Sequence, residues 1–201
     1  MRPWAGMNRA LMLLAALALV AVVVIGLTQA GGGSGDATTE GEPFDLAAAK
    51  QQLAGAPAPL AALHEQSNEF LDGGQDAFDA RLRELRGHPV VINKWASWCG
   101  PCRAELPILQ RISTERGKQV AFVGLNARDK RPAAERFAAR YPVPYPSYED
   151  PTERIARALD APSNFPVTLF VDERGRTVFT HQGGYRSAAD LEADIDEHLG
   201  A

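Results

Sequence analysis

Asn93–Glu105, NKWASWCGPCRAE, is the stretch of this 201-residue chain that decides its fold. It contains the only two cysteines of the chain, Cys99 and Cys102, with two residues between them. Cysteines at this spacing are typical of structural metal sites, of haem attachment sites and of redox-active dithiols. The residues around the pair, and the rest of the chain, favour one of these three uses.

A structural zinc site commonly needs two such cysteine pairs, or one pair together with two closely spaced histidines. The chain has no second pair, and its histidines occur singly, at His64, His88, His181 and His198. Attachment of a c-type haem needs a histidine directly after the second cysteine, where this chain has Arg103. The sequence therefore favours a dithiol that cycles with a disulfide, and it predicts no metal ion and no cofactor besides the Cys99–Cys102 disulfide.

The sequence predicts a strand before the cysteine pair and a helix after it. Residues 89–95 form an apolar run rich in β-branched residues, and residues 103–112 repeat apolar side chains at helical spacing. Cys99 then lies at the helix N-terminus, where unpaired N–H groups and the helix dipole lower a thiol pKa below its usual ~8.5. We therefore predict that Cys99 attacks a substrate disulfide and that Cys102 resolves the mixed disulfide.

Residues 93–105 resemble the active-site segment of the TlpA and ResA type of membrane-associated, thioredoxin-like proteins. These proteins are extracytoplasmic thiol-disulfide oxidoreductases, and the resemblance covers about residues 60–199. Its strongest part is the W-C-x-x-C-R-x-E pattern that begins at Trp98. The resemblance implies a thioredoxin-like α/β fold, in which helices flank a central mixed sheet.

A second part of the resemblance is the segment NFPVT at Asn164–Thr168. It matches the place where the thioredoxin fold keeps a cis-proline packed against the dithiol. The resemblance thus implies that Pro166 is cis and that the backbone of Phe165 pairs with an extended segment of the substrate. The predicted substrate-binding residues are Trp98, Gly100, Pro101, Phe165 and Pro166.

Three positions near the cysteines indicate which kind of thioredoxin-like protein this is and how protons could be transferred at the dithiol. Asn93 replaces the buried Asp of cytoplasmic thioredoxins, as is common in TlpA-like proteins. Glu105 shares a helix face with Cys102, and the resemblance implies that it tunes the thiol pKa and transfers protons. Alternatively, Glu105 is exposed and only interacts favourably with the helix dipole. Lys94 departs from the aromatic residue often found in the family, which is expected to change the packing or the electrostatics beside this strand.

The N-terminus carries a membrane-targeting signal. Residues 11–27 are all apolar or glycine, and Arg2 and Arg9 precede them without any acidic residue. This pattern predicts an anchor within residues 1–30, a single span with the soluble domain on the extracytoplasmic side of the cell membrane. The run is also compatible with a signal peptide, and cleavage near Ala30 would then give a secreted protein.

The rest of the chain divides into a linker and one domain. Residues 31–59 begin with GGGSG, which is typical of a flexible tether, and residues 44–53 could form a short amphipathic helix within it. Residues 60–201 are expected to form the thioredoxin-like domain, in which strands alternate with helices and a hairpin precedes the last helix.

The expected elements of this domain follow from local patterns. We expect strands at residues 60–71 (a pair), 119–125, 167–171 and 177–182, and helices at 76–86, 103–112, 132–141, 152–159 and 187–199. The turn at Asp172–Gly175 predicts a hairpin, and Ser187 is expected to cap the last helix. The 67 positions between Cys99 and Pro166 fit the additional strand and helix of TlpA-like proteins.

The function predicted from these features is the reduction of protein disulfides outside the cytoplasm. Gly-Pro between the cysteines is the thioredoxin dipeptide, and thioredoxin, at ~−270 mV, is far more reducing than the oxidant DsbA, at ~−120 mV. The resemblance implies an electron donor of the CcdA or DsbD type in the membrane and a role in cytochrome c maturation, with apocytochrome c as the substrate.

A disulfide-forming oxidase, a thiol peroxidase and a zinc-binding module are the alternatives. The net charge of −4 gives no support for nucleic-acid binding.

Overall fold

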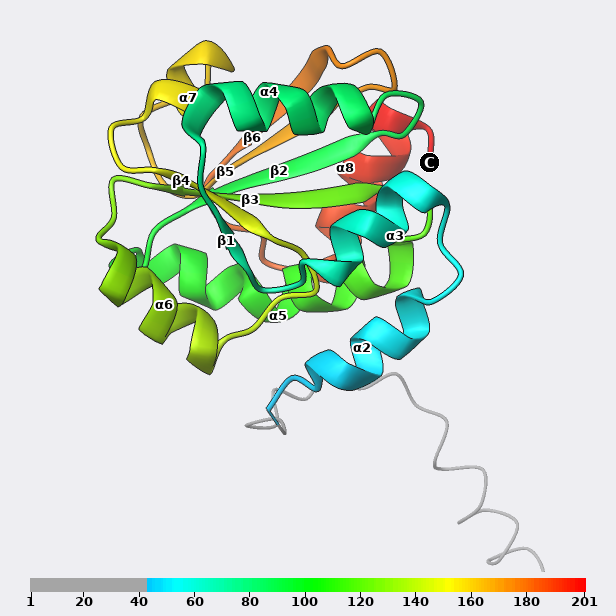
Figure 1. Cartoon of the computed structure of the whole chain (residues 1–201), viewed down its shortest axis with the longest axis horizontal. Coiled ribbons are helices and arrows are strands. Elements are labelled where there is room, and N and C mark those ends of the chain that lie inside the picture. The colour runs from blue at the N-terminus through cyan, green and yellow to red at the C-terminus, as the bar shows by residue number, and fades with distance from the viewer. Residues whose placement is uncertain (1–42) are drawn as a thin grey trace, which may run out of the picture. The chain divides into compact units, whose positions relative to one another are not determined.

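A six-stranded sheet forms the centre of the computed structural model, which describes residues 43–201 (Figure 1). The strands are β1 (Phe70–Leu71), β2 (Val90–Trp95), β3 (Ala121–Ala127), β4 (Ser147–Asp150), β5 (Val167–Val171) and β6 (Thr177–Gln182). Their order across the sheet is β1-β4-β3-β2-β5-β6. The first four strands of this order pair in parallel, while β5 pairs antiparallel with both β2 and β6. The sheet is therefore mixed, as expected.

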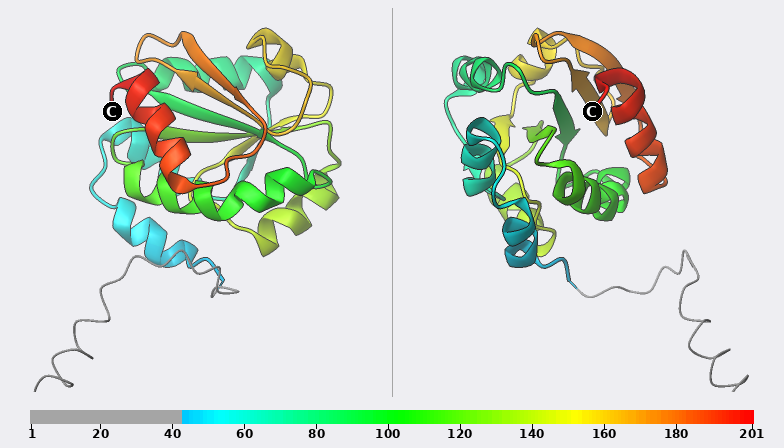
Figure 2. Two further views of the ribbon diagram at one scale, coloured as in Figure 1. Left: turned by 180° about the vertical axis from the view of Figure 1, so that it is seen from behind. Right: turned by 90° about the vertical axis from the view of Figure 1, so that its right-hand side faces the viewer.

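Helices cover both faces of this sheet (Figure 2). They are α2 (Leu46–Leu53), α3 (Ala58–Glu65), α4 (Gly74–Glu84), α5 (Gly100–Arg116), α6 (Arg131–Arg140), α7 (Arg154–Ala158) and α8 (Ala188–Leu199). Side chains alternate along β2, so Val90 and Ile92 pack in a core with α3, α4 and α7, and Val91 packs in a second core with α5 and α8. This layered arrangement confirms the thioredoxin-like α/β fold.

The β5–β6 hairpin has the bounds that the sequence predicts. Its turn is held by the Asp172 carboxylate, which accepts hydrogen bonds from the backbone N–H groups of Arg174 and Arg176. Gly175 has a φ of +78°, a conformation that costs glycine little. The cap of α8 is also confirmed, since the Ser187 hydroxyl accepts from the N–H of Asp190 at 3.2 Å.

The predicted strand pair at residues 60–71 is wrong. The first half of this segment belongs to α3, and only Phe70–Leu71 pairs with the sheet, beside β4. Leu60 and Leu63 are fully buried and three positions apart, which is the spacing of one helix face, and Pro59 lies in the first turn, where a helix tolerates it. Helical periodicity and the first-turn proline therefore explain why a helix forms here in place of the predicted strands.

The segment between α5 and β5 contains β3, α6, β4 and α7. This agrees with the strand and helix that the long separation of Cys99 and Pro166 predicts. Within the predicted linker, the possible short helix is present as α2, which buries Ala49 and Leu53 and packs against α5.

The predicted membrane segment, at residues 11–27, lies outside the described residues. Of the helices formed by residues 43–201, none combines the length and the apolar character needed to cross a membrane.

Candidate active site

The two cysteines lie at the start of α5 and are joined by a disulfide, with their Cα atoms 5.3 Å apart. Cys99 is the N-cap residue, with an extended backbone, and its Sγ accepts a hydrogen bond from the backbone N–H of Cys102 at 3.1 Å. The first N–H groups of a helix have no partner within the helix, so this one is free to bind the sulfur. When the disulfide is reduced, the same N–H and the helix dipole favour a thiolate at Cys99.

One carboxylate anchors the loop that leads from β2 into α5. Asp129 accepts hydrogen bonds from the backbone N–H of Ser97 at 2.5 Å and from the Ser97 hydroxyl at 2.8 Å, and Asn126 donates to it at 3.1 Å. Partial burial raises the pKa of Asp129, but these hydrogen bonds outweigh that effect and hold the pKa below its usual range. Asp129 was not among the residues predicted from the sequence; it follows β3, the strand that the structure pairs with β2.

Glu105 is completely buried, one turn of α5 after Cys102. Its carboxylate accepts hydrogen bonds from the side-chain amide of Asn93, at 2.9 Å, and from the backbone N–H of Tyr185, at 3.2 Å. Burial raises the pKa of Glu105 to about 7, while these two hydrogen bonds oppose the rise. The exposed alternative is therefore excluded, and a carboxyl that titrates near neutral pH lies on the same helix face as Cys102.

The loop after β6 closes the site beside Glu105. Gly184 lies between Pro101 and Pro166: a Cβ on it would be 3.4 Å from the carbonyl oxygen of Pro101 and 3.7 Å from Cγ of Pro166, which are ordinary van der Waals distances. The next residue, Tyr185, is held in place by its hydroxyl, which donates to Asp194 at 2.6 Å. This contact fixes the backbone N–H that binds Glu105.

The substrate-binding residues implied by the resemblance lie together at the start of α5 and the start of β5. The Phe165–Pro166 peptide bond is cis, as the resemblance implies. The Phe165 ring packs edge-on against Trp98, with ring centroids 5.0 Å apart, and Trp98 remains 56% exposed. Gly100 and Pro101 are also exposed. An accessible aromatic surface therefore borders the disulfide.

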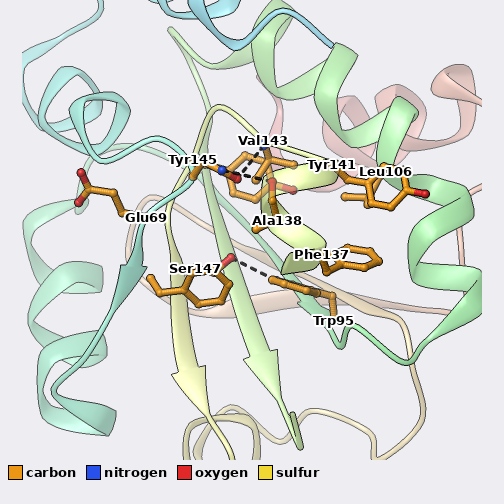
Figure 3. A pocket seen from close by; sticks show the side chains of 11 residues that line it. Glu69, Trp95, Leu106, Phe137, Ala138, Tyr141, Val143, Tyr145 and Ser147 are labelled. Carbon is orange, nitrogen blue, oxygen red and sulfur yellow. Dashed lines mark hydrogen bonds between the residues drawn. The ribbon is translucent and has the colours of Figure 1, made fainter. Parts of the chain in front are cut away.

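Trp95 packs on the buried side of the cysteine pair, in one cluster with Cys99 and Cys102. Its indole N–H donates to the Ser147 hydroxyl at 3.1 Å, and its ring stacks on Phe137 with centroids 5.2 Å apart. Figure 3 shows these side chains around a small pocket whose lining is largely aromatic and aliphatic. Neither cysteine lines this pocket, which meets the cluster around the dithiol only through Phe70, Trp95 and Phe137.

A cysteine pair that forms a disulfide at this helix start of a thioredoxin-like fold defines a thiol-disulfide oxidoreductase. Its redox group is the disulfide itself, and residues 43–201 contain no cluster of His, Cys, Asp and Glu side chains able to hold a metal ion. Residues 53–195 match the Redoxin family. The chain belongs to this family, and within it to the TlpA and ResA type of thioredoxin-like proteins.

The relatives agree with this assignment. Thiol-disulfide oxidoreductase ResA of Halalkalibacterium halodurans is 30% identical over 126 residues, which cover 62% of this chain and 71% of that protein. Thiol:disulfide interchange protein DsbE of Pseudomonas fluorescens biotype C is 34% identical over 93 residues, covering 46% of this chain and 50% of that protein. A crystal structure of a DsbE protein from Chlorobium tepidum aligns with a TM-score of 0.54 and 28% identity, over 59% of this chain and 85% of that chain.

Proposed function

We propose that this protein is a membrane-anchored, extracytoplasmic oxidoreductase that reduces disulfides in other proteins. The observation that carries the proposal is the exposed Trp98, which packs against Phe165 beside the buried Cys99–Cys102 disulfide. Aromatic side chains with one exposed face suit binding to a polypeptide, because they bury large apolar area upon contact. The Gly-Pro dipeptide between the cysteines supports reduction as the direction.

In the proposed cycle, the Cys99 thiolate attacks one sulfur of a substrate disulfide. The substrate S–S bond breaks, a mixed disulfide with Cys99 forms, and the first substrate sulfur leaves as a thiolate that takes up a proton. Glu105 accepts the proton of the Cys102 thiol, and the resulting Cys102 thiolate attacks Cys99 Sγ. The second substrate sulfur then leaves as a thiolate, so that two electrons have passed to the substrate and the Cys99–Cys102 disulfide has formed.

The proton step fits the surroundings of Glu105. An efficient general base has a pKa near the working pH, because it must be able both to take and to return the proton. Burial brings Glu105 into that range, with a pKa of about 7. We therefore assign proton transfer to Glu105, and nucleophilic attack and resolution to Cys99 and Cys102 respectively.

The apolar run at residues 11–27, preceded by Arg2 and Arg9, supports an anchor that leaves the catalytic domain outside the cytoplasm. A reductase there needs electrons from across the membrane, for which we propose a donor of the CcdA or DsbD type. The proposed substrate is the C-x-x-C-H disulfide of apocytochrome c. If the segment is cleaved near Ala30, the same domain acts as a secreted protein.

A trapping experiment tests this proposal. In full-length protein, Cys102→Ser should hold substrates as mixed disulfides on Cys99, because the resolving thiol is absent. The matched control is the double variant Cys99→Ser, Cys102→Ser, which should trap nothing. Recovery of cytochrome c precursors supports the maturation role. Recovery of other proteins alone refutes that role and leaves disulfide reduction standing, whereas recovery equal to the control refutes the proposed function.

A further inference from the structure

Lys94 lies in the middle of the sheet and is completely buried. Side chains alternate along β2, so Lys94 is on the face covered by α4 and α7, whereas Asn93 and Trp95 are on the face of α5. A buried ammonium group costs free energy unless it is paired and hydrogen-bonded. We therefore examined which groups pair with the Lys94 ammonium and which parts of the site those groups belong to.

Within residues 43–201, the Lys94 ammonium makes three contacts. It donates hydrogen bonds to Glu153 Oε1 at 3.1 Å and to the carbonyl oxygen of Pro162 at 2.5 Å, and it lies 4.3 Å from the centroid of the Phe165 ring. Pro162 and Phe165 are the two ends of the short segment that leads into the cis bond at Pro166. One buried charge thus binds this segment at both ends.

The partner carboxylate extends the network to the other aromatic residue of the site. Glu153 Oε2 lies 3.9 Å from Nε of Arg128, and the carbonyl oxygen of Arg128 accepts a hydrogen bond from the Trp98 indole N–H at 2.9 Å. The ammonium therefore contacts Phe165 directly and reaches Trp98 through Glu153 and Arg128. The half-buried Phe165 and the exposed Trp98, the two aromatic side chains beside the disulfide, are thus both supported from the buried side by the Lys94–Glu153 ion pair.

We propose that Lys94 is a positioning residue for protein substrates, which holds Phe165 and the backbone before Pro166 in the geometry that a substrate segment pairs with. This inference rests on the proposed function, in which an extended substrate segment binds at Phe165. A segment that is already ordered binds without the entropic cost of ordering it. Lys94 is on the opposite face of β2 from Asn93, the partner of Glu105, so its substitution leaves the hydrogen bonds of the proton acceptor in place.

Two kinds of substrate should respond differently to the loss of the Lys94 contacts. A protein disulfide uses the Phe165 segment for binding, whereas a small disulfide needs only access to Cys99. Loss of the Lys94 contacts should therefore weaken binding of the first and leave the reaction of the second unchanged. A lysine that only stabilised the fold would affect both reactions in parallel.

The test compares Lys94→Met with the wild type in full-length protein. Met keeps most of the stem and removes the charge, and the control Lys94→Met, Glu153→Gln also removes the carboxylate that would be left without its partner. The substrates are insulin, which carries protein disulfides, and 2-hydroxyethyl disulfide, which is small and neutral. For both variants we expect KM for insulin to rise about tenfold, or about 1.4 kcal/mol, while kcat and the rate with the small disulfide stay within about twofold.

A double-mutant cycle with Phe165→Leu keeps the test independent of folding losses at the buried site. Because part of the effect of Lys94 passes through the Phe165 ring, adding Lys94→Met to Phe165→Leu should raise KM by clearly less than the tenfold expected in the wild-type background. An unchanged insulin KM in Lys94→Met, or a parallel loss of both reactions, overturns the inference and leaves the proposed function intact. If wild-type protein does not reduce insulin while it reduces the small disulfide, the proposed function fails and this inference falls with it.

Discussion

Replacing Glu105 with Gln should change how the stability of the protein depends on pH. The carboxylate is completely buried and accepts hydrogen bonds from two donors, the amide of Asn93 and the N–H of Tyr185. Gln keeps the size of the side chain but does not titrate, and its own NH2 group must face one of these donors. The substitution therefore removes the proton equilibrium of this site and introduces a constant cost of about 1–3 kcal/mol for the mismatched hydrogen bond.

The sign of the pH effect follows from the direction of the pKa shift. Folding raises the pKa of Glu105 from 4.5 to about 7, so the folded protein binds this proton more tightly than the unfolded chain does. Stability is then greatest below pH 4.5, declines as the pH rises from 4.5 to about 7, and is level above that. At about 1.4 kcal/mol per pH unit the full decline is about 3 kcal/mol, of which about 2.5 kcal/mol falls between pH 5 and pH 8.

The assay is urea unfolding of the oxidised protein at pH 5 and at pH 8, for the wild type and for Glu105→Gln. Titrations that both proteins share cancel in the difference between their free energies of unfolding. This difference, wild type minus variant, should fall by about 2.5 kcal/mol from pH 5 to pH 8. The control Glu115→Gln, at a partly exposed position of the same helix, should show a difference that changes by less than about 0.5 kcal/mol. A difference for Glu105→Gln that is equally constant would refute the reasoning.

Three further substitutions test the supports of the site and of the fold. Asp129→Ala should lower the free energy of unfolding by about 1–3 kcal/mol, because Ser97 loses both of its hydrogen bonds to this carboxylate. The loss, measured by urea unfolding, should become smaller as the pH falls through the lowered pKa of Asp129. Gly124→Ala should lower the free energy of unfolding by about 1–3 kcal/mol, because the new Cβ collides with the Ser147 hydroxyl. A stability equal to that of the wild type would contradict this. Adding Ser147→Ala should recover part of the loss, as measured by thermal melting. Ser187→Ala should cost about 1 kcal/mol through loss of the α8 cap, and an unchanged melting temperature would show that the cap contributes nothing.

Local patterns were sufficient for most of the elements that position the dithiol. The β-branched run before Cys99 and the amphipathic pattern after it correctly placed the strand-to-helix junction, and the Asp172–Gly175 turn correctly placed the last hairpin. These signals are carried by residues close together in the sequence. The predicted strand pair at residues 60–71 is wrong, because Leu60 and Leu63 have the spacing of one helix face.

The parts of the site that escaped prediction depend on contacts between distant segments. Asp129 holds Ser97 across 32 positions of sequence, and the backbone N–H of Tyr185 binds Glu105 across 80. The burial of Lys94 likewise depends on Glu153, which lies 59 positions further along. Such pairs can be identified only once the order of the strands in the sheet is known. Neither residue of a pair carries a local sequence pattern that points to the other.

The reduction potential of the Cys99–Cys102 pair is the measurement that tests the proposed reductase most directly. It is obtained by equilibrating the protein with defined ratios of thiol to disulfide and quantifying the fraction of protein that is oxidised. The thioredoxin-like Gly-Pro dipeptide predicts a potential near ~−270 mV, which would make the dithiol a reductant of protein disulfides. A potential above about −150 mV, towards the range of DsbA-type oxidants, would contradict this account and assign the protein to disulfide formation instead.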